Sequence, residues 1–238
     1  MKTNTEYKNA ALAALKGNWA PAVLATVVFF FVAFICVGPA EIPVLTGSFN
    51  ADEIAAMASA GDIAGVMDAY SQLASWSSLG SLLRIFLYNV VTVGFTVAFL
   101  LLLRNGDDRL TSNMLDISFR KYFHKVWGMF LMFLFIFLWS LLFLIPGIIK
   151  SFSYAMTPYI LEERPELSAN EAIDHSRAMM KGHKFDLFWL LLSFIGWGIL
   201  CIFTFGIGFL WLVPYMQTAQ AAFYEDVKAD YELNGGLI

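Results

Sequence analysis

Residues 143–184 read FLIPGIIKSFSYAMTPYILEERPELSANEAIDHSRAMMKGHK. The stretch starts at the end of an apolar run, is interrupted by Pro146-Gly147, and continues as a second apolar leg that ends at Glu162-Glu163. Because proline cannot continue a preceding helix and glycine favours a turn, we predict that the chain reverses direction there. The stretch therefore predicts a helical hairpin followed by a short polar helix.

The composition of the 238-residue chain indicates the solvent in which it folds. Hydrophobic residues make up 59% of the chain and charged residues 14%, whereas soluble domains average about 45–50% apolar and about 25% charged residues. A soluble domain of this length cannot bury so much apolar surface, so much of the chain must contact lipid. We therefore predict an all-α, polytopic membrane helical bundle.

Net charge and cysteine content argue against several ligand classes. The net charge is −4, and the Lys and Arg residues are spread among short loops, whereas nucleic-acid binding requires a concentrated basic face. Cys36 and Cys201 both lie in apolar runs, which is typical of small core residues rather than of a disulfide framework or a zinc site. We expect no nucleic-acid partner, no metal and no cofactor.

The N-terminal part predicts a cytoplasmic segment and the first span. Residues 1–18 have a helical pattern, with Lys8 and Lys16 available to anionic headgroups. Residues 19–38 carry no charge, and about 19 helical residues cover a hydrocarbon core of roughly 30 Å. Gly38-Pro39 is expected to end this helix. The predicted apolar face of the first segment consists of Tyr7, Ala11, Leu12 and Leu15.

The next region is acidic. Residues 39–78 carry five acidic residues and no Lys or Arg, which suits an extracytoplasmic loop because positive residues are scarce on that side. Within it, capping residues followed by apolar stripes predict two short helices on the membrane surface. Further spans are expected at residues 82–103 and 126–145.

The basic residues favour six spans over four. Residues 104–125 carry five basic residues and are therefore placed in the cytoplasm. The chain then forms either four long kinked spans, or six spans with reversals at Pro146-Gly147 and at residues 204–208. Two reversals leave all of the 15 Lys and Arg residues except Arg84 and Lys150 on the cytoplasmic side. We predict six spans in a bacterial cytoplasmic membrane, with both chain termini cytoplasmic.

The return legs, residues 148–161 and 209–224, are the weakest spans. Residues 148–161 measure only about 21 Å as a helix. Three arrangements remain open: polar flanks extend the leg, the bilayer thins locally, or the leg packs in the bundle without fully crossing. Pro158 predicts a kink, which is tolerated where neighbouring groups satisfy the freed carbonyl.

Residues 168–181 predict an amphipathic helix at the cytoplasmic interface, packed against the bundle. Ser168 and Glu171 have the spacing of a capping box, and Gly182 supplies a stop. Lys181 falls in the last turn, where the helix dipole favours a cation, and Arg177 lies mostly off the apolar face. That apolar face contains Ala169, Ala172, Ile173, Ser176, Met179 and Met180.

Residues 79–228 are interpreted as one membrane bundle with a tandem repeat, followed by a polar C-terminal tail, residues 229–238. The repeat comprises residues 110–161 and 167–224, each with an amphipathic helix, a span, a glycine turn and a return span. It rests on matches at a constant offset of 61 residues, which pair Gly147 with Gly208, Tyr154 with Tyr215, and Thr157 with Thr218. Copies in the same orientation would be related by an axis near the membrane normal.

Polar groups at membrane depth are the candidate site, because they are costly there and often functional. One stripe lies on the first return leg and another on the last span, and facing stripes would line a polar cleft. Alternatively, Lys150 reaches the outer headgroups and the amides and hydroxyls bond between helices. The stripes are Lys150, Ser153, Tyr154 and Thr157, and Gln217, Gln220 and Tyr224.

The sequence has no recognisable catalytic motif, so we expect a protein that is not an enzyme. No HExxH, GxSxG, P-loop, glycine-rich dinucleotide motif or paired intramembrane carboxylate is present. His124, His175 and His183 are expected in interfacial or salt-bridging positions. An enzyme would need catalytic groups at the cytoplasmic face, such as His175, Asp174 or His183.

Three segments resemble a known family. IPGIIKSFSYAMTPYILEE (145–163), ELSANEAIDHSRAMMKGHKFDLF (166–188) and FGIGFLWLVPYMQTAQAAFYEDV (205–227) are similar to the bacterial integral-membrane family called domain of unknown function 975. More distantly, the Pro-Gly turn and the ExIxxSxxxMKGHK pattern resemble the membrane domain of some glycerophosphodiester phosphodiesterases. The resemblance implies a bacterial multi-pass protein with no assigned catalytic residues.

The leading hypothesis is a non-enzymatic membrane protein whose partners are the lipid bilayer and either a lipid-like ligand or other membrane proteins. It would bind or move an amphipathic molecule, or organise membrane partners. The alternative is a small-molecule transporter or channel, which a parallel repeat with a polar stripe favours, although no typical pore-lining run is present. A membrane-bound enzyme ranks third.

Overall fold

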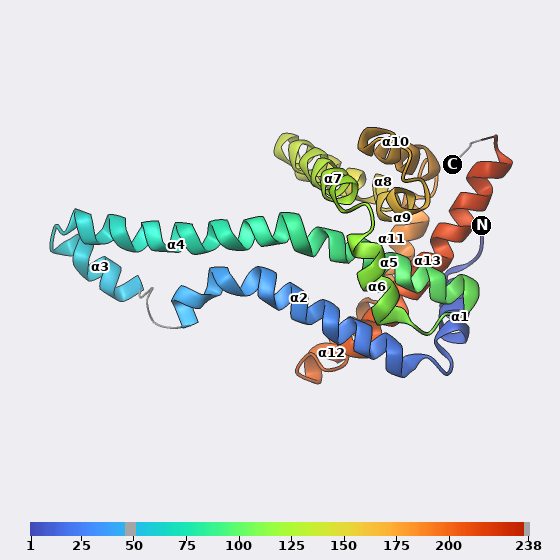
Figure 1. Cartoon of the computed structure of the whole chain (residues 1–238), viewed down its shortest axis with the longest axis horizontal. Coiled ribbons are helices and arrows are strands. Elements are labelled where there is room, and N and C mark those ends of the chain that lie inside the picture. Colours follow the sequence, from blue (N-terminus) through green and yellow to red (C-terminus); the bar gives the residue numbers. More distant parts are fainter. Residues whose placement is uncertain (46–50, 236–238) are drawn as a thin grey trace. The chain divides into compact units, whose positions relative to one another are not determined.

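The computed structural model describes residues 1–45 and 51–235, and every regular element within these ranges is helical (Figure 1). The all-α fold class is therefore confirmed. The chain divides into a larger unit, Met1–Phe29 with Val90–Ile238, and a smaller unit, Phe30–Asn89. The elements are α1 (Asn4–Leu15), α2 (Trp19–Leu45), α3 (Ala51–Ser59), α4 (Ile63–Leu83), the π-helix η1 (Arg84–Tyr88), α5 (Asn89–Asn105), α6 (Leu110–Phe119), α7 (Tyr122–Leu142), α8 (Leu144–Ser153), α9 (Thr157–Glu163), α10 (Ala169–Met179), α11 (Lys184–Leu192), α12 (Ile195–Phe203) and α13 (Phe209–Leu233).

Four helical segments are long and apolar enough to cross a membrane, which indicates an integral membrane protein. Within the described residues, the two predicted return legs are not among them, because α8 and α9 are short and α13 is charged in its second half. The four segments are Trp19–Cys36, Ile85–Asn105, Tyr122–Leu141 and Lys184–Phe203.

The first reversal lies three residues earlier than the sequence predicts. The extended residue Phe143 separates α7 from α8, so Pro146 becomes the third residue of α8. The first turn of a helix has N–H groups without intrahelical partners, and a proline there sacrifices no hydrogen bond. The helix therefore breaks before the proline and not at it.

The returning leg packs antiparallel along α7. Near the reversal, a Cβ added at Gly147 would overlap Ser140 of α7, so a glycine is needed for this close approach. At the other end, Lys125 of α7 forms a 2.6 Å salt bridge with Glu162 of α9. From Lys125 to Ser140 the shared length is about 22 Å at helical rise.

The second hairpin has the same form. Residues 204–208 reverse the chain between α12 and α13, and a Cβ added at Gly208 would lie 2.7 Å from the sulfur of Cys201. Further from the turn, Phe194 and Tyr215 meet edge to face with ring centroids 5.1 Å apart. The leg before this turn consists of two short helices, since α11 and α12 are separated at Ser193-Phe194.

The capping box at the start of α10 is confirmed. Ser168 accepts a hydrogen bond from the N–H of Glu171, whose carboxylate accepts one from the N–H of Ser168. Gly182 follows the helix with a φ of +97°, and Lys181 lies beyond the last helical turn. The helix packs against α7 and α9. Its predicted apolar face is buried: Ala169, Ala172, Ile173, Ser176, Met179 and Met180.

Helix α1 packs against α13. The Tyr7 hydroxyl donates a 2.6 Å hydrogen bond to Asp226, and a second, unpredicted capping box between Thr3 and Glu6 begins the helix. Lys8 donates to the carbonyl of Ser193 at 3.0 Å and lies over the ring of Phe194. On this side α1 faces protein, whereas the availability of Lys8 and Lys16 to lipid headgroups stays a prediction.

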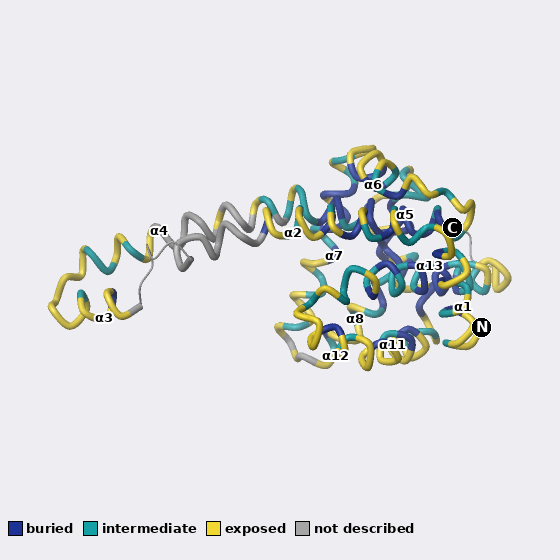
Figure 2. The backbone as a smooth tube through the Cα atoms, turned by 90° about the horizontal axis from the view of Figure 1, so that it is seen from below, coloured by how far each residue is buried: buried dark blue, intermediate teal, exposed yellow. Residues whose placement is uncertain are grey.

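Helix α5 contributes most to the core of the larger unit (Figure 2). Nearly every one of its residues from Val90 to Leu102 is buried, whereas no more than 28% of each predicted span on α2, α7 and α11–α12 is buried. A helix that is apolar all round belongs inside a bundle, with its neighbours facing lipid. The Phe29 and Phe95 rings stack on each other with centroids 4.3 Å apart.

Two expectations for the smaller unit are wrong. Helix α2 continues through Gly38-Pro39 to Leu45, so these residues do not stop it. The second helix of the predicted loop is not short, because α4 extends to Leu83 and runs through η1 into α5 without an intervening turn. No proline interrupts residues 63–105, and an uninterrupted helix satisfies its own backbone groups in an apolar environment. Asn50, which the sequence predicts to cap the first of the two surface helices, lies outside the described residues.

Candidate functional site

The first return leg is interrupted at Tyr154 to Met156, between α8 and α9. Ser176 of α10 compensates the interruption: its hydroxyl donates a 3.0 Å hydrogen bond to the carbonyl of Ser153 and accepts a 3.1 Å bond from the N–H of Met156. Pro158 is the second residue of α9, where its missing N–H costs nothing. A neighbouring helix thus satisfies the backbone groups that the break releases, which is the condition for a break at membrane depth.

A crevice of about 460 Å³ opens beside this break, between α7, α8 and α10. Its volume falls within the range of about 300–1,000 Å³ that is typical of small-molecule sites. Its wall combines aromatic, cationic, acidic and amide side chains. They are Phe135, Trp139, Lys150, Tyr154, Asn170, Ile173, Asp174 and Arg177.

Lys150 is held in this crevice by aromatic rings. Its ammonium lies 4.4 Å from the ring centroid of Trp139 and 5.8 Å from that of Tyr154. A cation over an aromatic face is attracted by the ring quadrupole, and the attraction is largest where water is excluded. The two rings therefore position a positive charge that stays available to an anionic group from outside the protein.

The polar rim of the crevice is supplied by α10. Asp174 and Arg177 form a 2.9 Å salt bridge, and both side chains are more than half exposed. With Lys150, the crevice contains two cations and one carboxylate, and Asn170 adds an amide donor and acceptor. The excess of positive charge favours a ligand with an anionic group. The aromatic and aliphatic side chains of the wall favour a ligand whose remaining part is apolar.

The structure brings together two members of the first predicted stripe and buries the other two. Lys150 and the largely buried Tyr154 line the crevice, whereas Ser153 and Thr157 are buried outside its lining. The Ser153 hydroxyl donates a 2.8 Å bond to the carbonyl of Ile149 in its own helix. This bond lies within α8, so the Ser153 hydroxyl does not bond between helices as the alternative predicts.

The second stripe lies on α13, outside the lining of this crevice. The Tyr224 ring stacks on Tyr159 of α9 with centroids 4.4 Å apart. Gln217 and Gln220 are partly buried on the same helix, and the side-chain oxygen of Gln217 has no hydrogen-bond partner among the described residues. That both stripes line a single cleft stays a prediction.

An ion network joins the ends of α5, α9 and α13. Glu163 lies 2.5 Å from both Arg104 and Lys228, Arg104 also pairs with Glu225, and the Tyr224 hydroxyl donates to Glu163. Burial by itself would raise the pKa of Glu163, but hydrogen bonds from Lys228 and Tyr224 and the positive charges of Arg104 and Lys228 outweigh it. The pKa of this carboxyl is therefore below its usual value.

Two of the histidines contact residues of α13. His183 lies 3.4 Å from Asp186 and 3.2 Å from Asp230, which confirms a salt-bridging position at the start of α11. The His175 ring meets Tyr231 edge to face with centroids 6.5 Å apart. These contacts tie the turn before α11 and the surface of α10 to the last turns of α13.

Sequence reasoning missed most of the crevice wall. Trp139 and Phe135 belong to a span that the sequence describes only as apolar, and Asp174 was named only as a group that a membrane-bound enzyme could use. Antiparallel pairing about the true reversal at Phe143 places Trp139 beside Lys150. The proximity of Trp139 and Lys150 could be predicted only from the correct position of the reversal.

The chain matches the model of a family described as Protein of unknown function (DUF975), over residues 1–150 and again over residues 141–231. No curated protein and no solved structure matches it. The distant resemblance to the membrane domain of glycerophosphodiester phosphodiesterases stays a prediction. Because the two matches together cover almost the whole chain, the protein belongs to the DUF975 family.

Proposed function

We propose that this chain is a non-enzymatic, six-span protein of the bacterial cytoplasmic membrane that binds an amphipathic molecule with an anionic headgroup in the crevice beside α8. The single observation that carries the proposal is the position of Lys150, which lies over Trp139 and opposite the Asp174–Arg177 pair. A cation on an otherwise apolar leg is costly, and such residues commonly mark binding sites.

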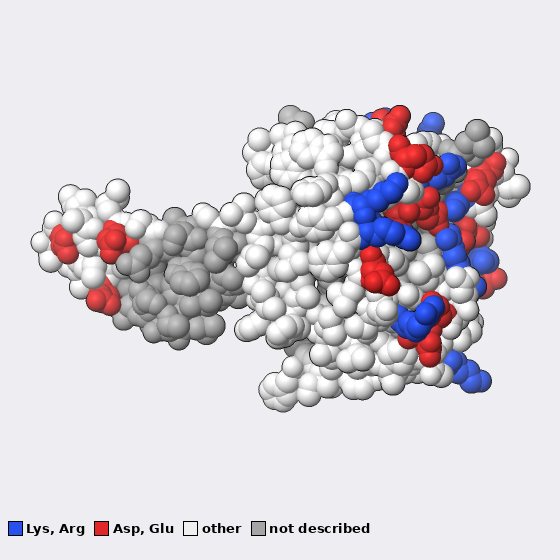
Figure 3. Space-filling view, in the orientation of Figure 1, with Lys and Arg blue, Asp and Glu red and all other residues white. Residues whose placement is uncertain are grey.

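The proposed topology rests on the two hairpins and on the charge distribution. Both tips are apolar and exposed, and Phe205 at the second tip is 98% exposed. In the larger unit, charged side chains gather at one end of the face drawn in Figure 3, and much of the remaining surface is uncharged. The network of Arg104, Glu163 and Lys228 joins three helix ends, so α5, α9 and α13 would emerge together on the cytoplasmic side.

The return leg is short for a bilayer core of roughly 30 Å. The polar residues that follow the leg support a full crossing of the membrane. Glu162 is paired with Lys125, and Glu163 is paired with Arg104 and Lys228. Paired carboxylates are less costly near lipid than free ones. The flank therefore extends the leg toward the cytoplasmic surface.

The test compares what co-purifies with the wild-type protein and with Lys150→Met, which removes the charge but keeps a long apolar side chain. Mass spectrometry of organic extracts identifies the bound amphiphile. We expect one acidic species to be lost from Lys150→Met and from Arg177→Gln. Lys16→Met, a matched loss of charge outside the crevice, should retain it. Identical extracts from all four proteins would refute the proposal.

A transporter of amphipathic molecules is the second candidate. The observation favouring it is the break at residues 154–156 beside the crevice, since transporter sites are often built from interrupted helices. Reconstituted vesicles containing a fluorescent anionic phospholipid discriminate the two functions. Movement of the label between leaflets, abolished by Lys150→Met, would indicate transport, whereas binding without movement supports the first function.

A further inference from the structure

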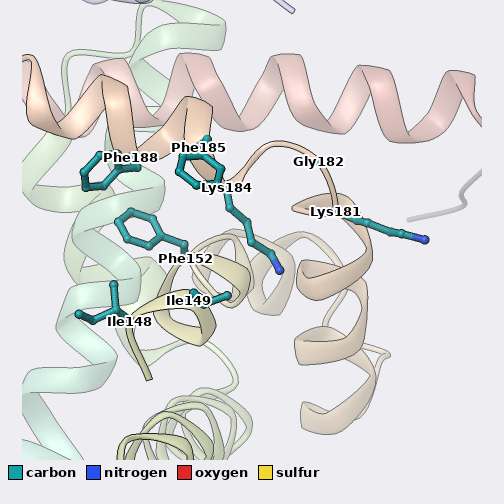
Figure 4. Close-up of a pocket in the computed structure, with 8 residues that line it drawn as sticks. All are labelled: Ile148, Ile149, Phe152, Lys181, Gly182, Lys184, Phe185 and Phe188. Carbon is teal, nitrogen blue, oxygen red and sulfur yellow. The ribbon is translucent and has the colours of Figure 1, made fainter. Parts of the chain in front are cut away.

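The opposite side of α8 carries a second pocket, which is separate from the crevice. We propose that this groove, between α8 and α11, holds one acyl chain of an anionic phospholipid whose phosphate lies at Lys184 (Figure 4). The inference does not depend on the crevice, because the two pockets share no lining residue. The groove residues are Ile148, Ile149, Phe152, Lys181, Gly182, Lys184, Phe185 and Phe188.

The groove has two apolar walls, and an aromatic ring from each wall contacts the other. Ile148, Ile149 and Phe152 of α8 form one wall, and Phe185 and Phe188 of α11 form the other (Figure 4). The rings of Phe152 and Phe188 meet edge to face with centroids 5.9 Å apart. The space between the walls is about 380 Å³. A narrow and almost wholly apolar groove matches a hydrocarbon chain better than a polar ligand.

These walls are not covered by the protein itself. Phe185 is 75% exposed, and Ile148 and Ile149 are each close to half exposed. Since the groove lies beside predicted membrane segments, the bilayer is the medium that would cover it. A lipid chain can enter from the side without any movement of the helices.

One end of the groove is cationic, which identifies the class of lipid. In Figure 4 the Lys184 side chain extends from the start of α11 toward α8, whereas Lys181 points away from the groove. Neither lysine forms a salt bridge among the described residues, and the nearby carboxylate of Asp186 lies beside His183. A phosphate at Lys184 would also face the first turn of α11, whose N–H groups favour an anion.

Charge complementarity therefore selects an anionic phospholipid over a neutral one. A zwitterionic headgroup would bring a second positive charge close to Lys184 and Lys181. The cationic end is supplied by the turn between α10 and α11, a region that the sequence places at the cytoplasmic interface. Chain and headgroup would thus lie at the depths they occupy in the bilayer itself.

The experiment uses the full-length protein in detergent, with native mass spectrometry of bound phosphatidylglycerol or phosphatidylcholine of equal chain length. We expect the wild type to retain phosphatidylglycerol in preference to phosphatidylcholine. Lys184→Gln should reduce bound phosphatidylglycerol about fivefold and leave phosphatidylcholine unchanged. Phe185→Ser should reduce both lipids, because it removes one wall. Lys16→Gln, a loss of the same charge elsewhere, should change neither.

Three outcomes would overturn the inference. Equal losses in Lys184→Gln and Lys16→Gln would mean diffuse surface attraction, and unchanged binding by Phe185→Ser would mean that no chain occupies the groove. If Lys150→Met alone loses phosphatidylglycerol, the lipid belongs to the crevice, so the groove is refuted while the proposed function stands. Elution volume and melting temperature of each variant verify that the fold is retained.

Discussion

The hydroxyl of Tyr224 donates a 2.7 Å hydrogen bond to the carboxylate of Glu163, 61 residues earlier in the chain. Glu163 follows the first predicted return leg, Tyr224 ends the second, and the same interval of 61 residues separates Gly147 from Gly208. These two glycines contact Ser140 and Cys201, respectively. The bond therefore connects the two hairpins at the end opposite their turns.

Replacing Glu163 by Gln tests the strength of this connection. The change keeps the shape of the side chain but removes the charge that pairs with Arg104 and Lys228. Hydrogen bonds to charged groups typically contribute about 1.5–3 kcal/mol. We expect a loss of this size in the free energy of unfolding, measured by thermal or denaturant unfolding in detergent. Glu232→Gln, at an exposed position, is the control and should cost little.

The same carboxylate predicts a pH dependence. Its pKa in the folded protein lies below the usual value of 4.5, so between the two values the unfolded chain binds more protons. The stabilisation is complete above about pH 4.5 and is lost as the pH falls through the folded pKa. The difference in stability between wild type and Glu163→Gln should therefore shrink on acidification. A constant difference down to pH 2 would contradict this assignment.

The close approach at Gly147 predicts an order among glycine substitutions. Gly147→Ala forces a methyl group into Ser140 and should cost about 1–3 kcal/mol of stability. Gly208→Ala should cost less, because its nearest neighbour is the sulfur of Cys201 at 2.7 Å. Gly196→Ala has open space around the added carbon and should be neutral or slightly stabilising. Melting temperatures of the three variants test the order, and an equal loss in all three would refute it.

Ser176 is expected to be necessary for the broken return leg. Ser176→Ala leaves the carbonyl of Ser153 and the N–H of Met156 without their partner. An unsatisfied buried backbone group costs about 1–3 kcal/mol. Hydrogen exchange should increase at residues 153–157 in particular. Ser151→Ala serves as the control, since that exposed hydroxyl bonds only within α8; equal exchange in both variants would contradict the role of Ser176.

The six-span topology predicts a labelling pattern in intact cells. In a background with Cys36 and Cys201 replaced, a membrane-impermeant maleimide should label Phe203→Cys at the second hairpin tip. It should not label Ser112→Cys or Asn170→Cys until the membrane is permeabilised. All three positions are exposed in the structure, so access depends on sidedness. Labelling of Ser112→Cys or Asn170→Cys in intact cells would exclude this topology.

Much of the fold could be predicted because it depends on local patterns. The capping box from Ser168 to Glu171 and the buried face of α10 follow from residue spacing alone. The reversals were predictable for the same reason. The second lies at residues 204–208 as predicted, whereas the first lies at Phe143 and not at Pro146-Gly147. Proline is as well accommodated in the first turn of the next helix as after the end of the previous one, and the sequence does not distinguish the two.

The sequence by itself determined that the chain is helical, that several of its helices are apolar enough for a membrane setting, and that it turns back near residues 143–147 and 204–208. These features follow from composition and periodicity, which act over a few residues. Only the tertiary structure decided that α10 packs along α7, which brings Asp174 and Arg177 to the crevice that holds Lys150. Periodicity defines one face of a helix, whereas the partner of that face is selected by packing between segments distant in the chain.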